Sequence, residues 1–571
     1  MHFLMAVALI APSVTSTAYA VETTSQQSSE AVTSTTDSSR KQEPVITQET
    51  TDIKQEAPNQ ATSDSVKQSQ ETTAPTETTN LETSTAEKEE TSTPQKITIL
   101  GTSDVHGQLW NWSYEDDKEL PVGLSQVSTV VNQVRAQNPA GTVLIDNGDN
   151  IQGTILTDDL YNKAPLVNEK THPMITAMNV MKYDAMVLGN HEFNFGLPLI
   201  QKIQQEATFP ILSANTYNKE DGRRFVKGTT TKELDFNQDG QPDLKVGIIG
   251  LTIPHIPLWD GPRVTSLNFL PLKEEAEKAV TELKTNDQAD IIVASIHAGQ
   301  QNSDPAASAD QVIENVAGID AYILGHDHLS FTKQGAAPNG KTVPVGGPKD
   351  TGTEVVKIDL SVAKNADKWE VQEGTATIVP TTNVPADEAV KAATKEYHEK
   401  TRAFIQEEIG TATADFLPKQ EIKGIPEAQL QPTAMISLIN NVQKEVTGAQ
   451  LSAAALFKYD SKLPAGKISY ATIFDIYKYP NTLVSVPING ENLLKYLEKQ
   501  GAYYNQTQPD DLTISFNPNI RVYNYDMISG VDYKIDISKP VGERIVDAKI
   551  DGQPLDPAKE YTLAMNNYRY G

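Results

Sequence analysis

The sequence predicts an α/β domain with layered sheets, preceded by a long segment that does not fold by itself. From residue 96 onward, short aliphatic runs alternate with helical patterns, and such alternation indicates an α/β domain. Before that point the chain is rich in Ser and Thr and poor in apolar residues. With 571 residues, the chain has room for two to four domains of roughly 100–200 residues each.

The composition excludes several classes of chemistry. The chain contains no cysteine, which rules out disulfide scaffolds, thiolate zinc sites and cysteine nucleophiles. Its 75 acidic and 48 basic residues give a net charge of −27. Nucleic-acid polymers are bound mainly through Lys and Arg, so we expect no such partner. The composition does not exclude a small phosphorylated substrate that is bound through metal ions.

The N-terminus has the features of a secretory signal peptide. Residues 1–20 contain no charged side chain and run from the apolar stretch 3–10 to the small-residue cleavage pattern Ala18-Tyr19-Ala20. The basic start typical of such peptides is missing. The alternative, an uncleaved anchor, requires a longer apolar run of about 20 residues.

Residues 21–94 are expected to form a disordered stalk. These 74 positions hold 29 Ser or Thr, 14 acids, five bases and no aromatic residue. Such a segment cannot bury enough apolar surface to offset the entropy of ordering. We therefore expect a secreted, extracellular protein attached to the cell wall or cell surface.

No membrane span is recognisable after the stalk, and the sequence stops directly after a predicted strand at 561–565. We expect a fragment whose last domain is incomplete and whose C-terminal anchor lies beyond Gly571.

Five aliphatic runs end in polar residues of the kinds that bind metals. The runs are 97–100, 142–145, 185–188, 291–294 and 321–324, and helical patterns at 124–137 and 272–284 lie between them. Ligands in α/β folds sit beyond the strand ends. The polar residues that follow the runs are Asp104 and His106, Asp149, Asn190 and His191, His297, and His326 and His328.

These residue types suit a pair of metal ions. Carboxylate and amide oxygens prefer hard divalent cations, imidazole suits zinc, manganese or iron, and a shared carboxylate can bridge two metals. One histidine near a strand end is more often structural than a ligand. Five of the nine histidines fall in these motifs, in order along the chain, which makes coincidence a poor explanation.

The motifs Asp104-x-His106, Gly148-Asp149, Gly189-Asn190-His191-Glu192, His297 and Gly325-His326-Asp327-His328 together resemble the set of the calcineurin-like metallophosphoesterases. Among its branches, the chain most resembles the secreted bifunctional 2′,3′-cyclic-nucleotide 2′-phosphodiesterase/3′-nucleotidases. The resemblance implies a layered β-sandwich with flanking helices at residues 95–384 and hydrolysis of a nucleotide phosphoester.

The resemblance also implies a role for each residue. Asp104, His106 and His328 would bind one divalent metal ion, zinc, manganese or similar. Asn190, His297 and His326 would bind a second ion, and Asp149 would bridge the two. His191 would be catalytic, donating a hydrogen bond or proton towards the phosphoryl oxygen or the leaving group.

A second, smaller domain follows. A helical pattern over residues 385–410 begins with Pro and acidic residues and ends at Gly410, as one long helix would. In the resembled family such a helix leads to an α/β nucleotide-recognition domain, here residues 411–571. There, two aromatic rings sandwich the base, and stacking on a ring contributes about 1–3 kcal/mol. We assign these rings to Tyr479 and Tyr523, with Tyr525 as the alternative to Tyr523.

Asn194 is expected to influence substrate choice. In the 5′-nucleotidase branch an Asp pairs with the catalytic histidine at this position, whereas the cyclic-phosphodiesterase branch resembles this chain in having Asn. An amide orients an imidazole but supplies no negative charge. We expect a preference for 2′,3′-cyclic and 3′-nucleotides over 5′-nucleotides, unless Asn194 is an ordinary loop residue.

Two weaker features have competing explanations. Residues 235–243 resemble part of a calcium-binding loop but lack the final Glu, and a hairpin turn explains them equally. Trp110 and Trp112 either line the mouth of the site or pack the loop.

Alternative functions remain at this level. Within the enzyme class they are a 5′-nucleotidase and a cyclic-dinucleotide phosphodiesterase. Outside that class is a surface adhesin or ligand-capture protein on the same fold, which the full set of competent metal and catalytic residues disfavours.

Overall fold

The computed structural model describes residues 93–163, 170–419, 422–477 and 482–569. The predicted signal peptide, nearly all of the predicted stalk and Tyr479 lie outside these residues. In the described part of the chain, no helix has the length and apolar character needed to cross a membrane.

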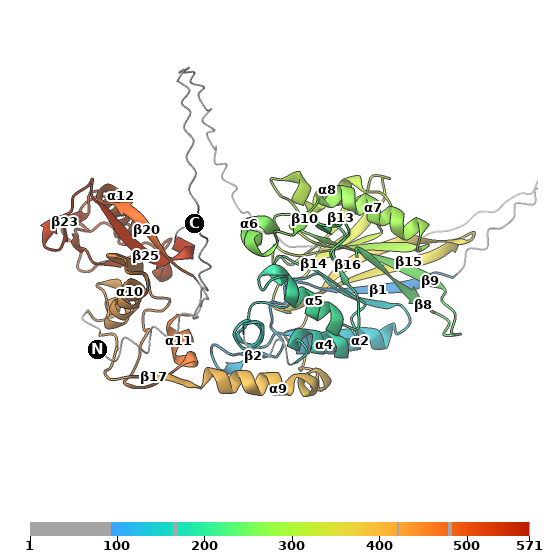
Figure 1. The fold of residues 1–571 in the computed structure, drawn as a ribbon, viewed down its shortest axis with the longest axis horizontal. Coiled ribbons are helices and arrows are strands. Elements are labelled where there is room, and N and C mark those ends of the chain that lie inside the picture. Colours follow the sequence, from blue (N-terminus) through green and yellow to red (C-terminus); the bar gives the residue numbers. More distant parts are fainter. Residues whose placement is uncertain (1–92, 164–169, 420–421, 478–481, 570–571) are drawn as a thin grey trace, which may run out of the picture. The chain divides into compact units, whose positions relative to one another are not determined.

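The N-terminal domain contains two six-stranded sheets (Figure 1). The first has the order β16 (Lys368–Pro380), β15 (Glu354–Asn365), β1 (Gln95–Thr102), β4 (Thr142–Asp146), β5 (Ala185–Val187), β6 (Ile211–Leu212). The second has the order β13 (Phe331–Ala336), β14 (Thr342–Gly347), β12 (Ala321–Leu324), β11 (Ile291–His297), β9 (Leu244–Thr252), β8 (Thr229–Leu234). All five predicted strands are present.

One hydrophobic core lies between the two sheets. Alternate residues of each strand point to opposite faces, so Ile97 and Ile99 of β1 join this inner core with Ile323 of β12, while Leu100 packs on the other side. Each strand near the sheet centre is buried on both faces, which explains its continuous aliphatic run.

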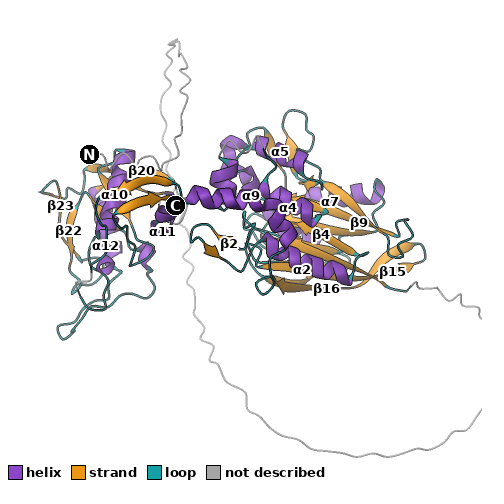
Figure 2. Ribbon diagram, turned by 90° about the horizontal axis from the view of Figure 1, so that it is seen from below, coloured by secondary structure: helices purple, strands orange, loops and turns teal. Residues whose placement is uncertain are grey.

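Helices cover the outer faces (Figures 1 and 2). The elements on the side of the first sheet are α2 (Leu124–Gln137), α4 (Pro173–Met181) and α5 (Leu197–Glu206), and those on the side of the second are α7 (Leu272–Thr285) and α8 (Ala309–Asn315). Shorter elements are β2 (Trp112–Ser113), β3 (Lys118–Glu119), a π-helix (Leu156–Asn162), β7 (Thr216–Asn218), α6 (Ile256–Asp260) and β10 (Leu267–Phe269). The layered α/β sandwich expected from the sequence is confirmed.

Helix α9 (Glu388–Ile405) follows, with Asp387 accepting a hydrogen bond from the Ala389 backbone as its N-cap. The predicted helical range of 385–410 is too long at its C-terminal end. Residues Glu408–Ala412 form strand β17, in which Gly410 pairs with Ile468 instead of ending the helix.

Two tryptophans fasten α9 to the N-terminal domain. The Trp110 ring stacks on His398 of α9, with centroids 3.8 Å apart, and its Nε1 donates to Thr394 Oγ1 at 2.9 Å. The Arg402 guanidinium lies 4.5 Å from the centre of the Trp112 ring. Of the two explanations for these residues, the structure favours packing of the loop.

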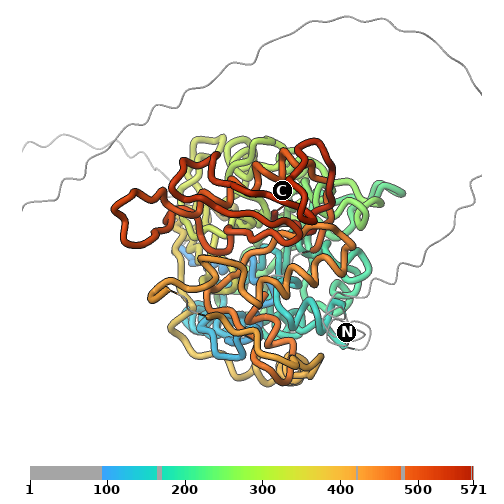
Figure 3. The backbone as a smooth tube through the Cα atoms, turned by 90° about the vertical axis from the view of Figure 1, so that its left-hand side faces the viewer, coloured from blue at the N-terminus to red at the C-terminus, as the bar shows by residue number. Residues whose placement is uncertain are grey.

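The C-terminal domain is also α/β, and its backbone runs from orange to red in Figure 3. Its main sheet has the order β20 (Leu483–Asn489), β25 (Glu560–Asn566), β18 (Leu451–Ala454), β21 (Met527–Ser529). The remaining elements are β19 (Gly466–Ser469), which pairs with β17, helices α10 (Ala434–Thr447), α11 (Tyr470–Ile476) and α12 (Gly490–Gly501), and a sheet of β22 (Asp532–Ile535), β23 (Ile545–Ile550) and β24 (Gln553–Pro554).

Candidate metal centre

The strand ends converge at one edge of the sandwich. Strands β1, β4 and β5 are parallel, with Thr102 opposite Asp146, so their carboxyl ends meet. Strands β11 and β12 are parallel in the second sheet. The two edges touch where the Asn147 amide, just after β4, donates to the Ile296 carbonyl of β11 at 3.2 Å. Polar residues from both sheets therefore face one another.

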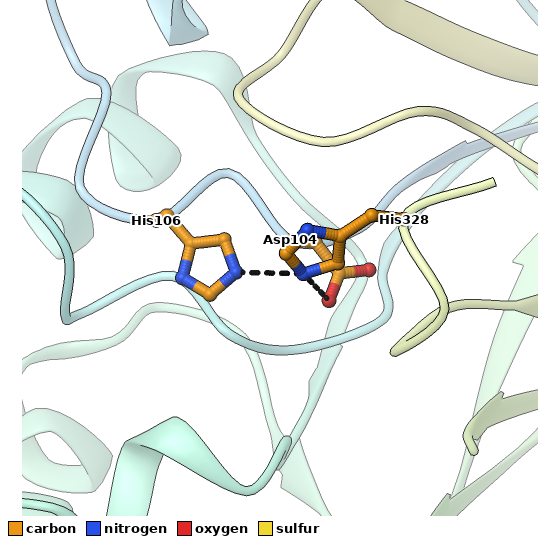
Figure 4. Close-up of side chains that lie close together, drawn as sticks. All are labelled: Asp104, His106 and His328. Carbon is orange, nitrogen blue, oxygen red and sulfur yellow. Dashed lines mark hydrogen bonds and ion pairs between the residues drawn. The ribbon is translucent and has the colours of Figure 1, made fainter. Parts of the chain in front are cut away.

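The first ligand group consists of Asp104, His106 and His328, whose potential ligand atoms all lie within 4.8 Å of one another. Figure 4 shows the two imidazoles turned towards each other, with their Nε2 atoms 3.1 Å apart. The His328 Nε2 lies 3.4 Å from Asp104 Oδ1. These three side chains come from the loops after β1 and β12.

The second ligand group consists of Asp149, His297 and His326. His297 Nε2 lies 3.1 Å from Asp149 Oδ2. The amide oxygen of Asn190 joins this group, at 3.2 Å from His297 Nε2 and 2.9 Å from His326 Nδ1. The structure thus brings together the residues expected to hold the second ion.

Asp149 connects the two groups. Its carboxylate belongs to the second group, while its backbone carbonyl accepts from the His106 backbone at 2.8 Å. Its other carboxylate oxygen, Oδ1, accepts from the His191 backbone at 2.7 Å. The position is compatible with the predicted bridging role.

The backbone of both groups is strained. Five of the seven expected ligands have a positive φ, which costs a non-glycine residue of order 1 kcal/mol each and tends to occur at functional sites. These residues are Asp104 (53°), His106 (49°), Asp149 (57°), His326 (72°) and His328 (54°). Strain repeated at five residues of one site indicates that the fold is arranged to aim their side chains.

Neighbouring acceptors fix which imidazole nitrogen faces each group. His297 Nδ1 lies 2.7 Å from the Asn147 carbonyl, and His106 Nδ1 lies 3.3 Å from Gln152 Oε1. Both acceptors require a proton on Nδ1, so Nε2 is the nitrogen that faces the ligand group. Histidines that bind metals are usually held in this way, with the second ring nitrogen donating to an outer acceptor.

Glu192 is a residue whose role the sequence did not reveal, although it stands inside the fourth motif. Its buried carboxylate accepts from the backbones of Gly189 (2.7 Å), Asp149 (2.8 Å) and Asn150 (2.7 Å). It therefore ties the loop carrying Asp149 to the loop carrying Asn190. Gly189 itself has no room for a side chain, because a Cβ there would collide with the Asp149 carboxylate.

Burial and charge shift the proton affinities in opposite directions within each group. Burial opposes the charge of His297, but the adjacent Asp149 carboxylate outweighs it and raises the pKa of His297 to about 10. Burial lowers the pKa of His326 and of His106. A hydrogen bond to Asp104 raises the pKa of His328.

The donor set fits divalent cations. Asp104 Oδ1 is buried, and within the described residues the imidazole of His328, itself a member of the first group, lies 3.4 Å from it, so this oxygen faces the first group. Carboxylate oxygen, amide oxygen and imidazole nitrogen are the donors that zinc, manganese and iron take. Two other candidates form no comparable group among the described residues. In the loop at 235–243, the carboxylates accept backbone N–H groups of the loop itself. His255 pairs with Asp304 at 2.9 Å.

His191 lies beside the first group and is not itself a member of either. Its ring is 5.2 Å from the His106 ring, and its Nδ1 lies 2.7 Å from Asn194 Oδ1. Asn194 was expected to influence the substrate, and its amide oxygen is engaged with the predicted catalytic residue.

Two of the candidate base-stacking tyrosines, Tyr523 and Tyr525, lie within the described residues, and they differ in burial and packing. Tyr525 is only 5% exposed, stacks on Tyr503 at 4.3 Å and bonds through its hydroxyl to Tyr504 at 2.9 Å. Tyr523, in a short 3-10 turn, is half-buried. Because the Tyr525 ring is buried and already stacked on Tyr503, it is less accessible to a base than Tyr523, which favours Tyr523.

A β-sandwich with two carboxylate–imidazole groups at its strand ends defines a metal-dependent hydrolase. Residues 97–330 match the family model described as calcineurin-like phosphoesterase, and residues 408–571 match the 5′-nucleotidase C-terminal domain. The chain belongs to this family of two-domain calcineurin-like phosphoesterases and is a metal-dependent phosphoric ester hydrolase.

Relatives share most of the chain. It is 30% identical to the 2′,3′-cyclic-nucleotide 2′-phosphodiesterase/3′-nucleotidase of Haemophilus influenzae, over 83% of this chain and 80% of that protein. It is also 30% identical to the trifunctional nucleotide phosphoesterase protein YfkN of Bacillus subtilis, over 84% of this chain, but spans only 36% of that longer protein. A crystal structure of YfkN superposes with a TM-score of 0.51 and 30% identity, covering 55% of this chain and 100% of that one.

Proposed function

We propose that the chain is an exported two-metal phosphoesterase that hydrolyses 2′,3′-cyclic nucleotides to 3′-nucleotides, and then 3′-nucleotides to nucleosides and phosphate. The observation that carries this proposal is the pair of ligand groups at one edge of the sandwich, with His191 beside the first of them. The similarity to the Haemophilus influenzae enzyme supports the nucleotide substrate.

The chain's own residues divide the work. Asp104, His106 and His328 would hold one divalent cation and Asn190, His297 and His326 the other, with Asp149 shared. When bound, such a pair supplies Lewis-acid activation of water and stabilises charge on the phosphate oxygens. The strained loops keep the donors in place before substrate arrives.

His191 acts on the leaving group. With Nδ1 held by Asn194, Nε2 is the nitrogen available to a substrate. A proton on Nε2 passes to the departing 2′-oxygen of the cyclic diester as its P–O bond breaks, while Nδ1–H keeps its hydrogen bond to Asn194. In the second step His191 serves the departing 3′-oxygen in the same way.

The test is a substrate panel of 2′,3′-cyclic AMP, 3′-AMP, 5′-AMP and a cyclic dinucleotide, assayed with and without chelator. We expect metal-dependent turnover, with higher kcat/KM on the first two. The amide at Asn194 carries this preference, because it supplies the imidazole with no negative charge of its own. A preference for 5′-AMP would overturn the branch assignment, and binding without turnover would favour a ligand-capture protein.

Export and surface attachment are part of the proposal. The uncharged N-terminal segment and the Ser/Thr-rich stretch support it. Mass spectrometry of the protein from the producing cells should find a mature N-terminus at Val21 in the extracellular or cell-wall fraction. Recovery of an intact Met1 from the cytoplasmic fraction alone would contradict it.

A further inference from the structure

A chain of hydrogen bonds continues outward from His191. Asn194 Oδ1 lies 2.7 Å from His191 Nδ1, and on the other side Asn194 Nδ2 donates to Asp260 Oδ2 at 2.8 Å. The second oxygen of Asp260 accepts from Arg263 Nη1 at 2.9 Å. Asp260 is the last residue of α6, and nothing in its sequence context marks it as part of the site.

The chemistry of these groups fixes the direction of every bond. An ionised carboxylate only accepts, so the NH₂ end of the Asn194 amide must face Asp260 and its oxygen must face His191. That oxygen in turn requires a proton on His191 Nδ1. Without Asp260, the two ends of the amide could exchange, and the NH₂ group would then favour the opposite tautomer of the imidazole.

Among the described residues, the local contacts of the Asp260 side chain are limited to an ion pair with Arg263, three residues on. Asp260 is 4% exposed, and burying a carboxylate is unfavourable unless it is paired and hydrogen-bonded. It precedes the 3-10 turn Gly261–Arg263, yet its side chain makes no capping hydrogen bond there. Its two oxygens are instead directed to Asn194 and to Arg263, whose side chain is 52% exposed.

We propose that Asp260 is a positioning residue: through the Asn194 amide it holds His191 in the tautomer with hydrogen on Nδ1, leaving Nε2 for the phosphoester. The inference rests on the proposed catalytic role of His191. It extends that role, because it adds a buried carboxylate that acts on the imidazole through the intervening amide.

Exchanging the two side chains gives the sharpest test. Asn194→Asp alone sets two carboxylates against each other at the 2.8 Å contact, and Asp260→Asn alone leaves one amide oxygen to serve two donors. In the double variant Asn194→Asp/Asp260→Asn, every donor again has an acceptor. We expect each single variant to lose about 10- to 100-fold in kcat with little change in KM, as for other outer partners of site residues.

The double variant should recover to within a few fold of the parent enzyme. A kcat unchanged in Asp260→Asn, or a double variant no better than the worse single variant, overturns the proposal. The matched control is Asp304→Asn, which pairs with His255 and caps the 3-10 turn Pro305–Ala307. Because Asn also caps such a turn, we expect no change there.

A spectroscopic measurement separates this inference from the proposed reaction. In protein labelled with ¹⁵N-histidine, long-range nitrogen–proton correlations report which imidazole nitrogen carries the hydrogen, and the His191 signal is assigned from its absence in His191→Ala. We expect the Nδ1–H tautomer in the parent and a mixture in Asp260→Ala. The same tautomer in both proteins refutes the positioning role, even if all nucleotides in the panel are hydrolysed. If none is hydrolysed, the proposed function fails while the tautomer still decides the role of Asp260.

Discussion

The two ligand groups are built from similar residues but differ in their exposure. In the second group, the side chains of Asp149 and His297 are 1% and 0% exposed. In the first, Asp104 is fully buried, while the side chain of His328 is 42% exposed. His326 in the second group and His106 in the first are both partly exposed, so the groups differ in degree, and a cation in the second would be less accessible to solvent than one in the first.

The difference extends to charge. Two adjacent buried side chains of opposite charge, His297 and Asp149, stabilise each other, and this raises the pKa of His297 to about 10. Metal ligation requires a neutral imidazole, so a cation entering the second group must displace that proton. The comparison therefore indicates a more buried, proton-coupled group, here called the closed group, and a more exposed one, the open group, with Asp149 expected to be shared between them.

The largest effect should come from Asp149, the residue expected to be shared by both ions. Asp149→Ala removes a carboxylate from the second group and from the boundary with the first, and should abolish turnover. Metal analysis of the purified variant should show loss of at least one ion per chain. Near-normal activity with both ions bound would contradict the shared role.

Next in size is His191, which lies beside the first group without belonging to it. His191→Ala should lower kcat by roughly 10²–10⁴, the range for a lost general acid or base, while metal content stays near that of the parent. The matched control is its neighbour, since Asn190→Ala should lose metal. Loss of metal in His191→Ala would make this residue a ligand.

The sequence predicted the fold class and the candidate ligands because each motif directly follows a buried aliphatic strand, whereas the division of these ligands into two groups came from the family resemblance. The parallel register of β1, β4 and β5 brings the motifs of the first sheet to one edge, but those that follow β11 and β12 reach it only because the two sheets pack together. Contacts between distant segments left no such signal. Asp260 reaches Asn194 across 66 residues, and the part that Glu192 plays depends on backbone N–H groups, which carry no sequence identity.

The predicted linker helix at 385–410 shows the same limit of sequence-based prediction at its C-terminal end. The apolar spacing continues through Ile409, but that residue belongs to β17, where pairing with β19 overrides the helical pattern. Tertiary pairing of this kind cannot be read from local periodicity.

A smaller effect distinguishes the two groups through one histidine of each, His328 of the open group and His297 of the closed group. His328→Ala should weaken metal binding at the open group by about 10- to 100-fold, and excess metal should restore activity. His297→Ala leaves Asp149 buried without its partner, so it should also lower the thermal stability of the metal-free protein. Equal behaviour of the two variants in melting and metal titration would contradict the exposure difference.

The last prediction, which changes no ligand of the closed group, is a pH dependence of metal affinity at that group, measured in His328→Ala, where the open group is weakened. Because the folded-state pKa of His297 is about 10, it is protonated at pH 7 and must release that proton to bind a cation. Affinity should therefore rise about tenfold per pH unit and level off near pH 10. The raised pKa also means that the charged pair stabilises the metal-free fold below pH 6.5, and that this stabilisation is lost as the pH rises towards 10. Calorimetric titrations with zinc or manganese, in buffers of different ionisation enthalpy, count the protons released. We expect about one per ion at pH 7, and a count of zero would remove the proton-coupled distinction between the groups while leaving the difference in exposure intact.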